Sequence, residues 1–76
     1  MVKPTRVTNS IRALRFASGE MTQAELAERI GVTRQTIIAI EQGRYSPSLE
    51  VAFQIARVLK VPLDDVFHYP DTSAEE

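Results

Sequence analysis

The chain has 76 residues, of which 43% are apolar and 25% are charged, and this composition is ordinary for one soluble globular domain. It has no cysteine, which excludes disulfide bonds and thiolate metal sites. The first ten residues, MVKPTRVTNS, lack the apolar stretch of a signal peptide, and no segment approaches the length needed to span a membrane. We therefore expect a cytoplasmic protein that does not associate with membranes.

Charge is distributed unevenly along the chain, although its net value is only −1. Residues 1–45 contain seven Lys/Arg and four Asp/Glu, which gives +3, whereas residues 46–76 contain two and six, which gives −4. The asymmetry indicates either a basic functional half with an acidic far side or a solvated surface of uneven charge. Likewise, Lys3, Arg6 and Arg12 near the N-terminus are typical both of an arm that lies on DNA and of a solvated segment.

The first predicted helix follows this basic segment. Thr8 or Asn9 is suited to cap it, Ile11 and Leu14 fall on its inner side, and it ends near Gly19. No convincing strand pattern occurs here or farther along the chain.

The second predicted helix begins at a capping box, Thr22-x-x-Glu25, in which each side chain accepts a hydrogen bond from the backbone N–H of the other residue. Leu26, Ala27 and Ile30 recur at helical spacing and define its buried side. Ala27 is small and falls where two helices would meet at close range.

A turn containing glycine follows in the stretch IGVTRQTI, residues 30–37. Gly31 is suited to end the second helix in the left-handed conformation, which glycine adopts without steric penalty. We expect Val32 to tuck beneath the turn and Thr33 to cap a third helix that runs to Gly43. Two short helices joined by such a turn form a helix-turn-helix.

The third predicted helix points Ile37 and Ile40 toward the core. Its outward side carries five residues: Arg34, Gln35, Ile38, Ala39 and Gln42. Arginine can make two-point contacts to guanine and glutamine to adenine, and apolar side chains can contact the thymine methyl group. The alternative is a set of merely exposed helix residues, and the adjacent turn favours contact with bases.

The fourth predicted helix runs from Leu49 to about Leu59, with Ser48 as its cap, and its apolar arc is wider than the roughly 100° stripe of a surface helix. Pro62 opens a short fifth helix that ends near Phe67. Either the first and fifth helices cover this arc, or part of it forms a homodimer interface. In the second case the interface comprises eight residues: Val51, Ile55, Val58, Val61, Leu63, Val66, Phe67 and Tyr69.

The run TQAELAERIGVTRQTIIAIEQGRYSPSL, residues 22–49, resembles the helix-turn-helix of the phage Cro and repressor (XRE) family of transcription regulators. The similarity spans roughly residues 9–67. It implies an all-α, compact five-helix, lambda-repressor-like DNA-binding domain whose helix-turn-helix consists of helices 2 and 3. Such a domain binds double-stranded DNA, usually as a homodimer on a short inverted-repeat operator, with helix 3 in the major groove.

The resemblance also implies roles for particular residues. Base contacts fall to Arg34, Gln35 and Ala39, with Thr36 close by. Ile38 joins this base-reading group through its outward position on the helix, where it would meet a thymine methyl group, a partner subunit or only water. Contacts to the DNA backbone fall to a second group: Gln23, Thr33, Gln42, Arg44, Tyr45 and Ser46. Gln23 would also brace Gln35, and Arg15 would form an inward ion pair with Glu41. Together with Gly31 and Ala27, which were assigned above from the turn and the helix packing, Arg15 and Glu41 make up the structural residues.

Two features depart from the family pattern. The stretch SGEMTQ between the first two helices is one residue longer than the common form RGLTQ. Ile38 and Ala39 also replace polar residues that are often found at these positions, so recognition would depend more on methyl contacts and DNA shape.

An enzyme is not expected, because His68 is the only histidine and no cluster of metal ligands accompanies it. Asp64 and Asp65 fall in the first turn of a helix, where acids favour the positive end of the dipole. No cofactor, metal or small-molecule ligand is expected. The alternative to a DNA-binding regulator is a protein-interaction module of the same fold, such as the antitoxin of a toxin–antitoxin pair or a transcriptional bridging factor.

For either function we divide the chain into three parts. They are an N-terminal basic arm (1–8), a helix-turn-helix DNA-binding domain (9–69) and a disordered acidic tail (70–76).

Overall fold

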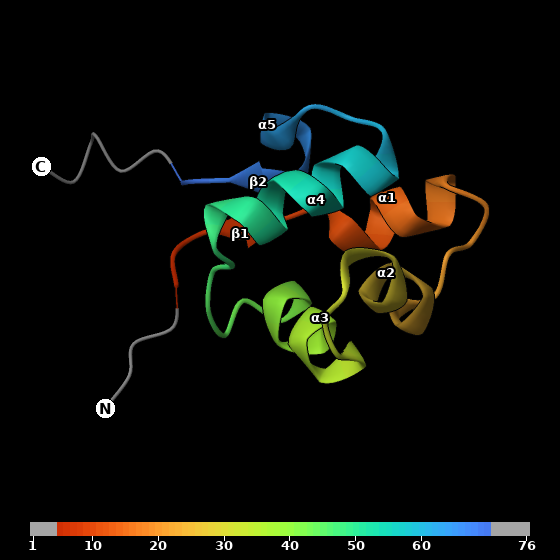
Figure 1. Ribbon diagram of the computed structural model, residues 1–76. Coiled ribbons are helices and arrows are strands. Elements are labelled where there is room, and N and C mark those ends of the chain that lie inside the picture. The colour runs from red at the N-terminus through yellow and green to blue at the C-terminus, as the bar shows by residue number, and fades with distance from the viewer. Residues whose placement is uncertain (1–4, 71–76) are drawn as a thin grey trace, which may run out of the picture.

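The structure is a computed structural model and describes residues 5–70. Its elements in chain order are β1 (Thr8–Asn9), α1 (Ile11–Ala17), α2 (Gln23–Ile30), α3 (Arg34–Glu41), α4 (Leu49–Leu59), α5 (Leu63–Val66) and β2 (Phe67–His68). The prediction of a five-helix, all-α fold is confirmed (Figure 1). Lys3 of the expected arm and residues 71–76 of the expected acidic tail lie outside the described residues.

Three of the helices begin at the predicted capping residues. The box at α2 is complete, since Glu25 N donates to Thr22 Oγ1 over 3.0 Å and Thr22 N donates to Glu25 Oε1 over 2.8 Å. The hydroxyl of Thr33 accepts from the backbone of α3, and the hydroxyl of Ser48 does so for α4. Side-chain caps satisfy donors that the first helical turn leaves without partners, so these helix starts follow from local sequence.

The core lies between α4 and the other helices. α4 runs across the middle of the fold, with α5 on one side and α2 and α3 on the other (Figure 1). Each helix contributes at least one fully buried side chain: Ile11, Leu26, Ile37, Ile40, Ile55 and Val66. Full burial of one such side chain stabilises the fold by about 1.5–3 kcal/mol.

The core corrects part of the expected dimer interface. Ile55 and Val66 are both 0% exposed within one copy of the chain, so neither side chain is free to contact a second copy. The apolar arc of α4 packs against α2 and α5, and Ile11 of α1 belongs to the same core cluster. The other six residues of the expected interface remain at least partly accessible: Val51, Val58, Val61, Leu63, Phe67 and Tyr69.

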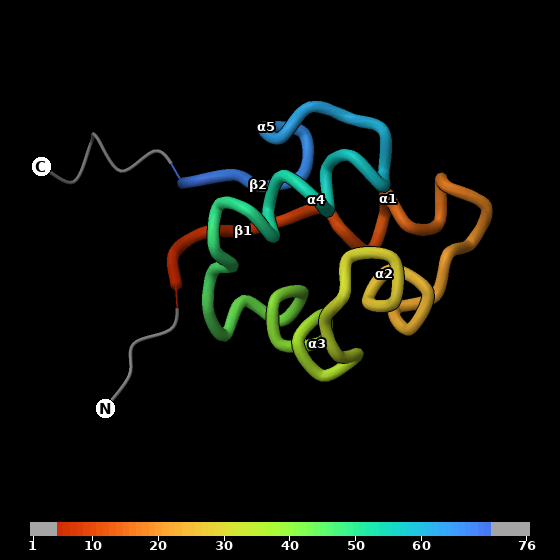
Figure 2. Tube along the Cα trace, in the orientation of Figure 1, coloured from red at the N-terminus to blue at the C-terminus, as the bar shows by residue number. Residues whose placement is uncertain are grey.

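A short antiparallel strand pair joins the two ends of the domain, and the sequence analysis did not predict it. Thr8 pairs with His68 and Asn9 with Phe67. Segments that are far apart in the sequence therefore lie side by side (Figures 1 and 2). A two-residue pairing between distant segments has no periodic sequence pattern, which explains why it was missed.

The start of α1 also differs from the prediction. Ser10 holds the capping position without a side-chain hydrogen bond, while Asn9 Oδ1 accepts from Ile11 N over 3.2 Å. α1 ends at Ala17. The connection to α2 then passes through two successive left-handed residues, Gly19 at φ +79° and Glu20 at φ +59°.

Candidate nucleic-acid interface

The turn between α2 and α3 has the predicted geometry. Gly31 ends α2 at φ +77° and ψ +31°, and its N–H donates to the carbonyls of Ala27 and Glu28. Val32 is partly buried against the core, and its N–H donates to Ala27 O over 3.0 Å. Thr33, the next residue, caps α3, which begins at Arg34. A single left-handed residue thus sets the angle between the two helices.

α3 presents a polar N-terminal end to solvent. Ile37 and Ile40 anchor the helix in the core, whereas Arg34, Gln35 and Gln42 are exposed. No hydrogen bond or ion pair within residues 5–70 engages the side chain of Arg34 or Gln35. Thr36, Ile38 and Ala39 are half-buried at the margins of this surface, and Thr36 Oγ1 lies 3.0 Å from Thr33 Oγ1. The donors and acceptors of Arg34 and Gln35 are therefore available to a ligand.

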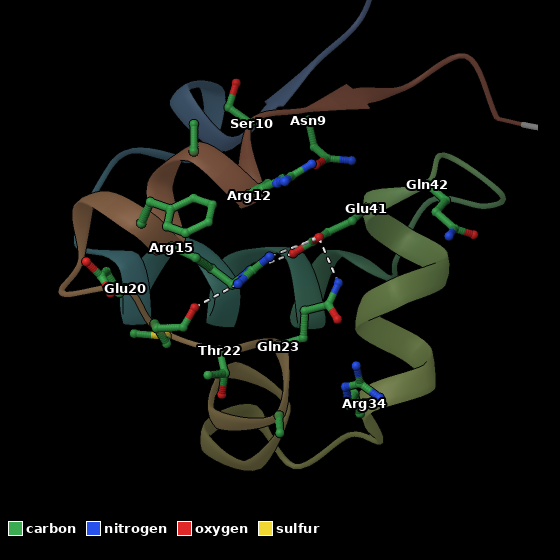
Figure 3. A pocket seen from close by; sticks show the side chains of 14 residues that line it. Asn9, Ser10, Arg12, Arg15, Glu20, Thr22, Gln23, Arg34, Glu41 and Gln42 are labelled. Atoms are coloured by element: carbon green, nitrogen blue, oxygen red, sulfur yellow. Dashed lines mark hydrogen bonds and ion pairs between the residues drawn. The ribbon is translucent and has the colours of Figure 1, made fainter.

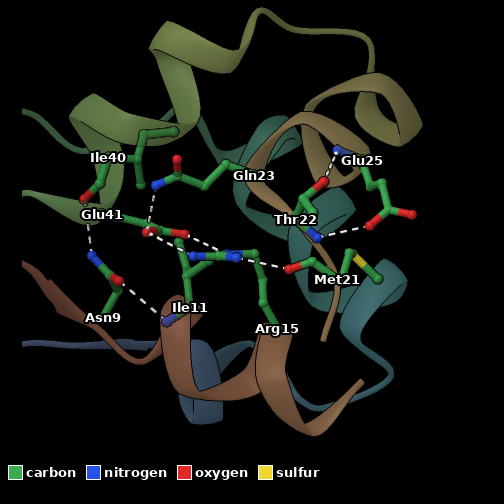
Figure 4. A network of polar contacts seen from close by, with 9 residues as sticks. All are labelled: Asn9, Ile11, Arg15, Met21, Thr22, Gln23, Glu25, Ile40 and Glu41. Atoms are coloured by element: carbon green, nitrogen blue, oxygen red, sulfur yellow. Dashed lines mark hydrogen bonds and ion pairs between the residues drawn. The ribbon is translucent and has the colours of Figure 1, made fainter. Parts of the chain in front are cut away.

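A buried polar network connects α3 to α1 and α2 (Figure 4). Arg15 of α1 donates twice to Glu41 of α3, from Nε to Oε2 over 2.7 Å and from Nη2 to Oε1 over 3.2 Å. Their side chains are only 9% and 10% exposed. The third arginine nitrogen donates to the carbonyl of Met21 over 2.7 Å. The expected inward ion pair is thus present, and the backbone before α2 shares it.

Gln23 occupies a different place in this network from the one expected. Its Nε2 donates to Glu41 Oε1 over 3.0 Å, so the amide joins the ion pair instead of bracing Gln35. No hydrogen bond between Gln23 and Gln35 is found between residues 5 and 70. Gln23 is half-buried at the first position of α2, and its side chain thus connects α2 to α3.

Asn9 positions the end of α3, a role that the sequence analysis, which treated Asn9 only as a helix cap, did not predict. Its Nδ2 donates to Ile40 O at the end of α3 over 2.9 Å, while its Oδ1 accepts from the first residue of α1. The partner carbonyl lies 31 residues away in the chain, so no local motif indicates it. The C-terminal end of α3 is thus held by Asn9 and Glu41, which leaves its N-terminal end to face solvent.

The loop after α3 adds further exposed polar groups. Arg44, Tyr45 and Ser46 are all exposed, and Arg44 N donates to Ala39 O over 3.0 Å. The backbone of this loop therefore stays close to the end of α3. The guanidinium of Arg44 has no ion-pair partner among the described residues.

Metal sites and membrane spans are not found in the described part of the chain. Between residues 5 and 70, no group of three or more His, Cys, Asp or Glu is arranged to hold a metal ion. No helix in the same range is long and apolar enough to cross a membrane.

The comparison with protein families decides what kind of domain this is. Residues 11–66 match the helix-turn-helix family HTH_3. The chain belongs to this family. Family membership confirms the XRE-type resemblance and the helix-turn-helix fold, and the protein is a DNA-binding transcriptional regulator rather than an enzyme.

Individual relatives agree with this assignment. An uncharacterized HTH-type transcriptional regulator of Methanocaldococcus jannaschii is 55% identical over 51 residues, which cover 67% of this chain and 77% of the relative. One from Methanothermobacter thermautotrophicus is 57% identical over 56 residues, covering 72% and 81%. The transcriptional repressor RstR of the cryptic phage CTXphi, from Vibrio cholerae, is 33% identical over 69 residues, covering 91% and 61%.

A solved structure shows the same fold. The crystal structure of a candidate DNA-binding protein from Bacteroides fragilis superimposes with a TM-score of 0.71 at 26% sequence identity. The match covers 82% of this chain and 98% of that protein. This HTH_3 member therefore has the architecture of a solved protein over most of its length.

Proposed function

We propose that the protein is a sequence-specific regulator that inserts α3 into the major groove of double-stranded DNA, and that it acts as a repressor. The observation that carries the proposal is the exposed N-terminal end of α3. Arg34 and Gln35 are exposed there without partners among the described residues, on a helix whose other end is held by Asn9 and Glu41. The similarity to RstR, a phage transcriptional repressor, supports the sign of regulation.

Specificity would come from the residues on the outward side of α3. Arg34 is suited to guanine O6 and N7, and Gln35 to adenine N6 and N7. Ile38 and Ala39 are half-buried, so their exposed methyl groups suit the thymine methyl group better than a polar base edge. Thr36 lies beside them, with its hydroxyl directed to Thr33.

Affinity would come from contacts to phosphates on either side of α3. The residues proposed for this role lie at the start of α2, at the two ends of α3 and in the loop that follows: Gln23, Thr33, Gln42, Arg44, Tyr45 and Ser46. Phosphate contacts fix register but carry no direct sequence information. Arg44 has the strongest expected effect, because it is the one full charge in this group.

We further propose a homodimer on an inverted repeat, with the recognition helices about 34 Å apart. Its interface would use the accessible apolar residues of α4, of α5 and of the segments next to them: Val51, Val58, Val61, Leu63, Phe67 and Tyr69. A domain of this size buries only about 60–65% of its unfolded surface, so a second copy would add stability. Sedimentation should give a dimer for the wild type and a monomer for Val58→Asp.

The decisive experiment selects bound sequences from random DNA and then measures the affinity of two variants. Gln35→Ala should relax specificity at one base position in each half-site. Arg44→Ala should weaken all sites equally and lower the salt dependence of binding. Equal effects of both substitutions, or binding that survives Arg34→Ala with Gln35→Ala, would contradict α3 as the recognition helix.

A second candidate function, binding to a partner protein, is favoured by one observation. Leu49 and Phe53 lie one turn apart on α4 and are 72% and 52% exposed, on the side opposite Val51 and Val58. An antitoxin or bridging factor would use such a surface. Leu49→Ser with Phe53→Ser would then abolish regulation in cells without changing DNA affinity, whereas Gln35→Ala would leave regulation intact.

A further inference from the structure

A cleft of about 1120 Å3 lies between α1, the start of α2 and α3 (Figure 3). Three arginines and two acids line it: Arg12, Arg15, Arg34, Glu20 and Glu41. Since Arg15 and Glu41 neutralise each other, the remaining formal charge is two arginines against one glutamate. The cleft is therefore an electropositive site whose other polar lining is mostly neutral amides and hydroxyls.

Arg12 is the cation on the α1 side of this cleft. It is exposed, and no residue in the described part of the chain forms an ion pair with it. Its guanidinium lies 6.0 Å from the ring centroid of Phe16, one helical turn later. Such a contact supports the cation through the face of the ring and leaves the N–H groups at its edge free to donate.

Phe16, the aromatic partner of Arg12, lies at the surface rather than in the core. It is 55% exposed, although large apolar side chains usually find cover in a domain core. Its ring also lies 6.0 Å from the guanidinium of the buried Arg15. The ring is thus within reach of two guanidinium groups, that of the buried Arg15 and that of Arg12 at the edge of the cleft. A contact between Arg12 and Phe16, one helical turn apart, favours guanidinium positions beside the ring.

The opposite side of the cleft belongs to the proposed DNA surface. Arg34 and Gln42 come from the two ends of α3, and Gln23 comes from the start of α2 (Figure 3). With α3 in the major groove, a phosphate backbone that borders the groove must pass beside α3. A cleft that places cations and amides on both sides suits a polyanionic strand better than a compact apolar ligand.

We infer that this cleft receives the DNA backbone that borders each half-site, and that Arg12 of α1 donates to one of its phosphates from the Phe16 ring. The inference rests on the proposed function, because it concerns the same bound DNA. It extends the DNA-binding surface from α2 and α3 to a helix outside the helix-turn-helix. It also gives a role to Arg12. From the sequence alone, this residue belongs either to an arm that lies on DNA or to a solvated segment.

The test measures the affinity of the full chain for its selected operator between 50 and 200 mM salt. Loss of one phosphate contact should reduce the slope of log affinity against log salt by about 0.9, so the deficit of Arg12→Ala should be about 3.5-fold greater at 50 mM than at 200 mM. Arg12→Lys should retain most of the slope. Arg57→Ala is the matched control, since Arg57 is an exposed arginine on α4 that does not line the cleft.

Phosphate ethylation provides the second measurement. Ethylation of one phosphate per half-site should interfere with binding of the wild type and have no effect on Arg12→Ala. A wild-type slope and interference pattern for Arg12→Ala would overturn the inference while the proposed function stands. An equal loss of slope in Arg57→Ala would overturn it too, because the effect would then be one of net charge. Absence of wild-type binding to any DNA would overturn both proposals.

Discussion

Gln23 and Glu41 are joined by a hydrogen bond of 3.0 Å between Nε2 and Oε1, and the same carboxylate holds Arg15. One side chain of α3 therefore fixes the position of α1 and of α2 at once. The surface proposed to contact DNA is assembled from all three helices. A change at Glu41 should consequently disturb both stability and the geometry of this surface.

Replacement of Glu41 by alanine should lower the free energy of unfolding by about 3–5 kcal/mol, because it leaves the buried guanidinium of Arg15 without a counter-charge. Urea denaturation followed by circular dichroism measures this directly. A loss below 1 kcal/mol would mean that water compensates the arginine, and the network would then not hold the helices together.

The double variant Arg15→Met with Glu41→Leu is the control for this prediction. Removing both charges also removes their desolvation cost, so the double variant should be more stable than Glu41→Ala. Full recovery is not expected, since Met21 O and the Gln23 amide also lose their partners. A double variant as unstable as the sum of its single changes would contradict the pairing.

Gly31→Ala tests the left-handed residue of the turn. A side chain in this conformation is strained by roughly 1–2 kcal/mol, offset by about 0.4–1 kcal/mol from the reduced entropy of the unfolded chain. Apart from Gly31 itself and the adjacent backbone, no heavy atom lies within 4 Å of the position that a Cβ would take, so backbone strain causes the effect. Thermal unfolding should show a net loss of about 1 kcal/mol for alanine and a smaller loss for Gly31→Asn. Equal stability of the three proteins would contradict this account.

The features that sequence analysis predicted correctly depend on neighbours in the chain. Thr22 with Glu25, Gly31 and Thr33 each act within one helical turn, so their spacing was sufficient. The Arg15–Glu41 pair spans 26 residues, and only the family resemblance suggested it.

The features that were missed depend on the tertiary fold. Asn9 bonds to Ile40 O across 31 residues, and β1 pairs with β2 only after the helices have brought the two ends together. The burial of Ile55 likewise depends on how α2 and α5 cover α4, which the helical pattern of α4 does not determine.

Lys60→Gly should stabilise the protein. Lys60 ends α4 at φ +63° and ψ +40°, the same left-handed geometry in which Gly31 ends α2, and its N–H donates to the carbonyls of Ala56 and Arg57. Lysine is strained in this conformation and glycine is not, so a net gain of up to about 1 kcal/mol is expected after the entropy of the unfolded chain is subtracted.

The matched variant for Lys60→Gly is Gly31→Lys. It should lose a similar amount of folding free energy, because both residues end a helix in the left-handed conformation. Differential scanning calorimetry of both variants would show the midpoints moving in opposite directions. If Lys60→Gly lowers the thermal midpoint, the prediction is wrong, and the Lys60 side chain stabilises the fold by more than the strain of its backbone destabilises it.

Glu25 should make stability depend on pH in the acidic range. The hydrogen bonds from the Thr22 backbone and hydroxyl lower the pKa of the Glu25 carboxyl from its usual value of 4.5. A carboxyl whose folded pKa is lowered contributes stability that is present above its unfolded pKa and is lost as pH falls through the folded value. The advantage of the wild type over Glu25→Gln in thermal midpoint should thus be constant near neutral pH and shrink as pH falls below 4.5. Thr22→Ala removes the hydroxyl but keeps the backbone N–H, so it should reduce this difference without abolishing it. Glu28→Gln, which changes an exposed glutamate of the same helix, should preserve the difference. A difference that grows on acidification would mean that the carboxylate is destabilising at the start of α2.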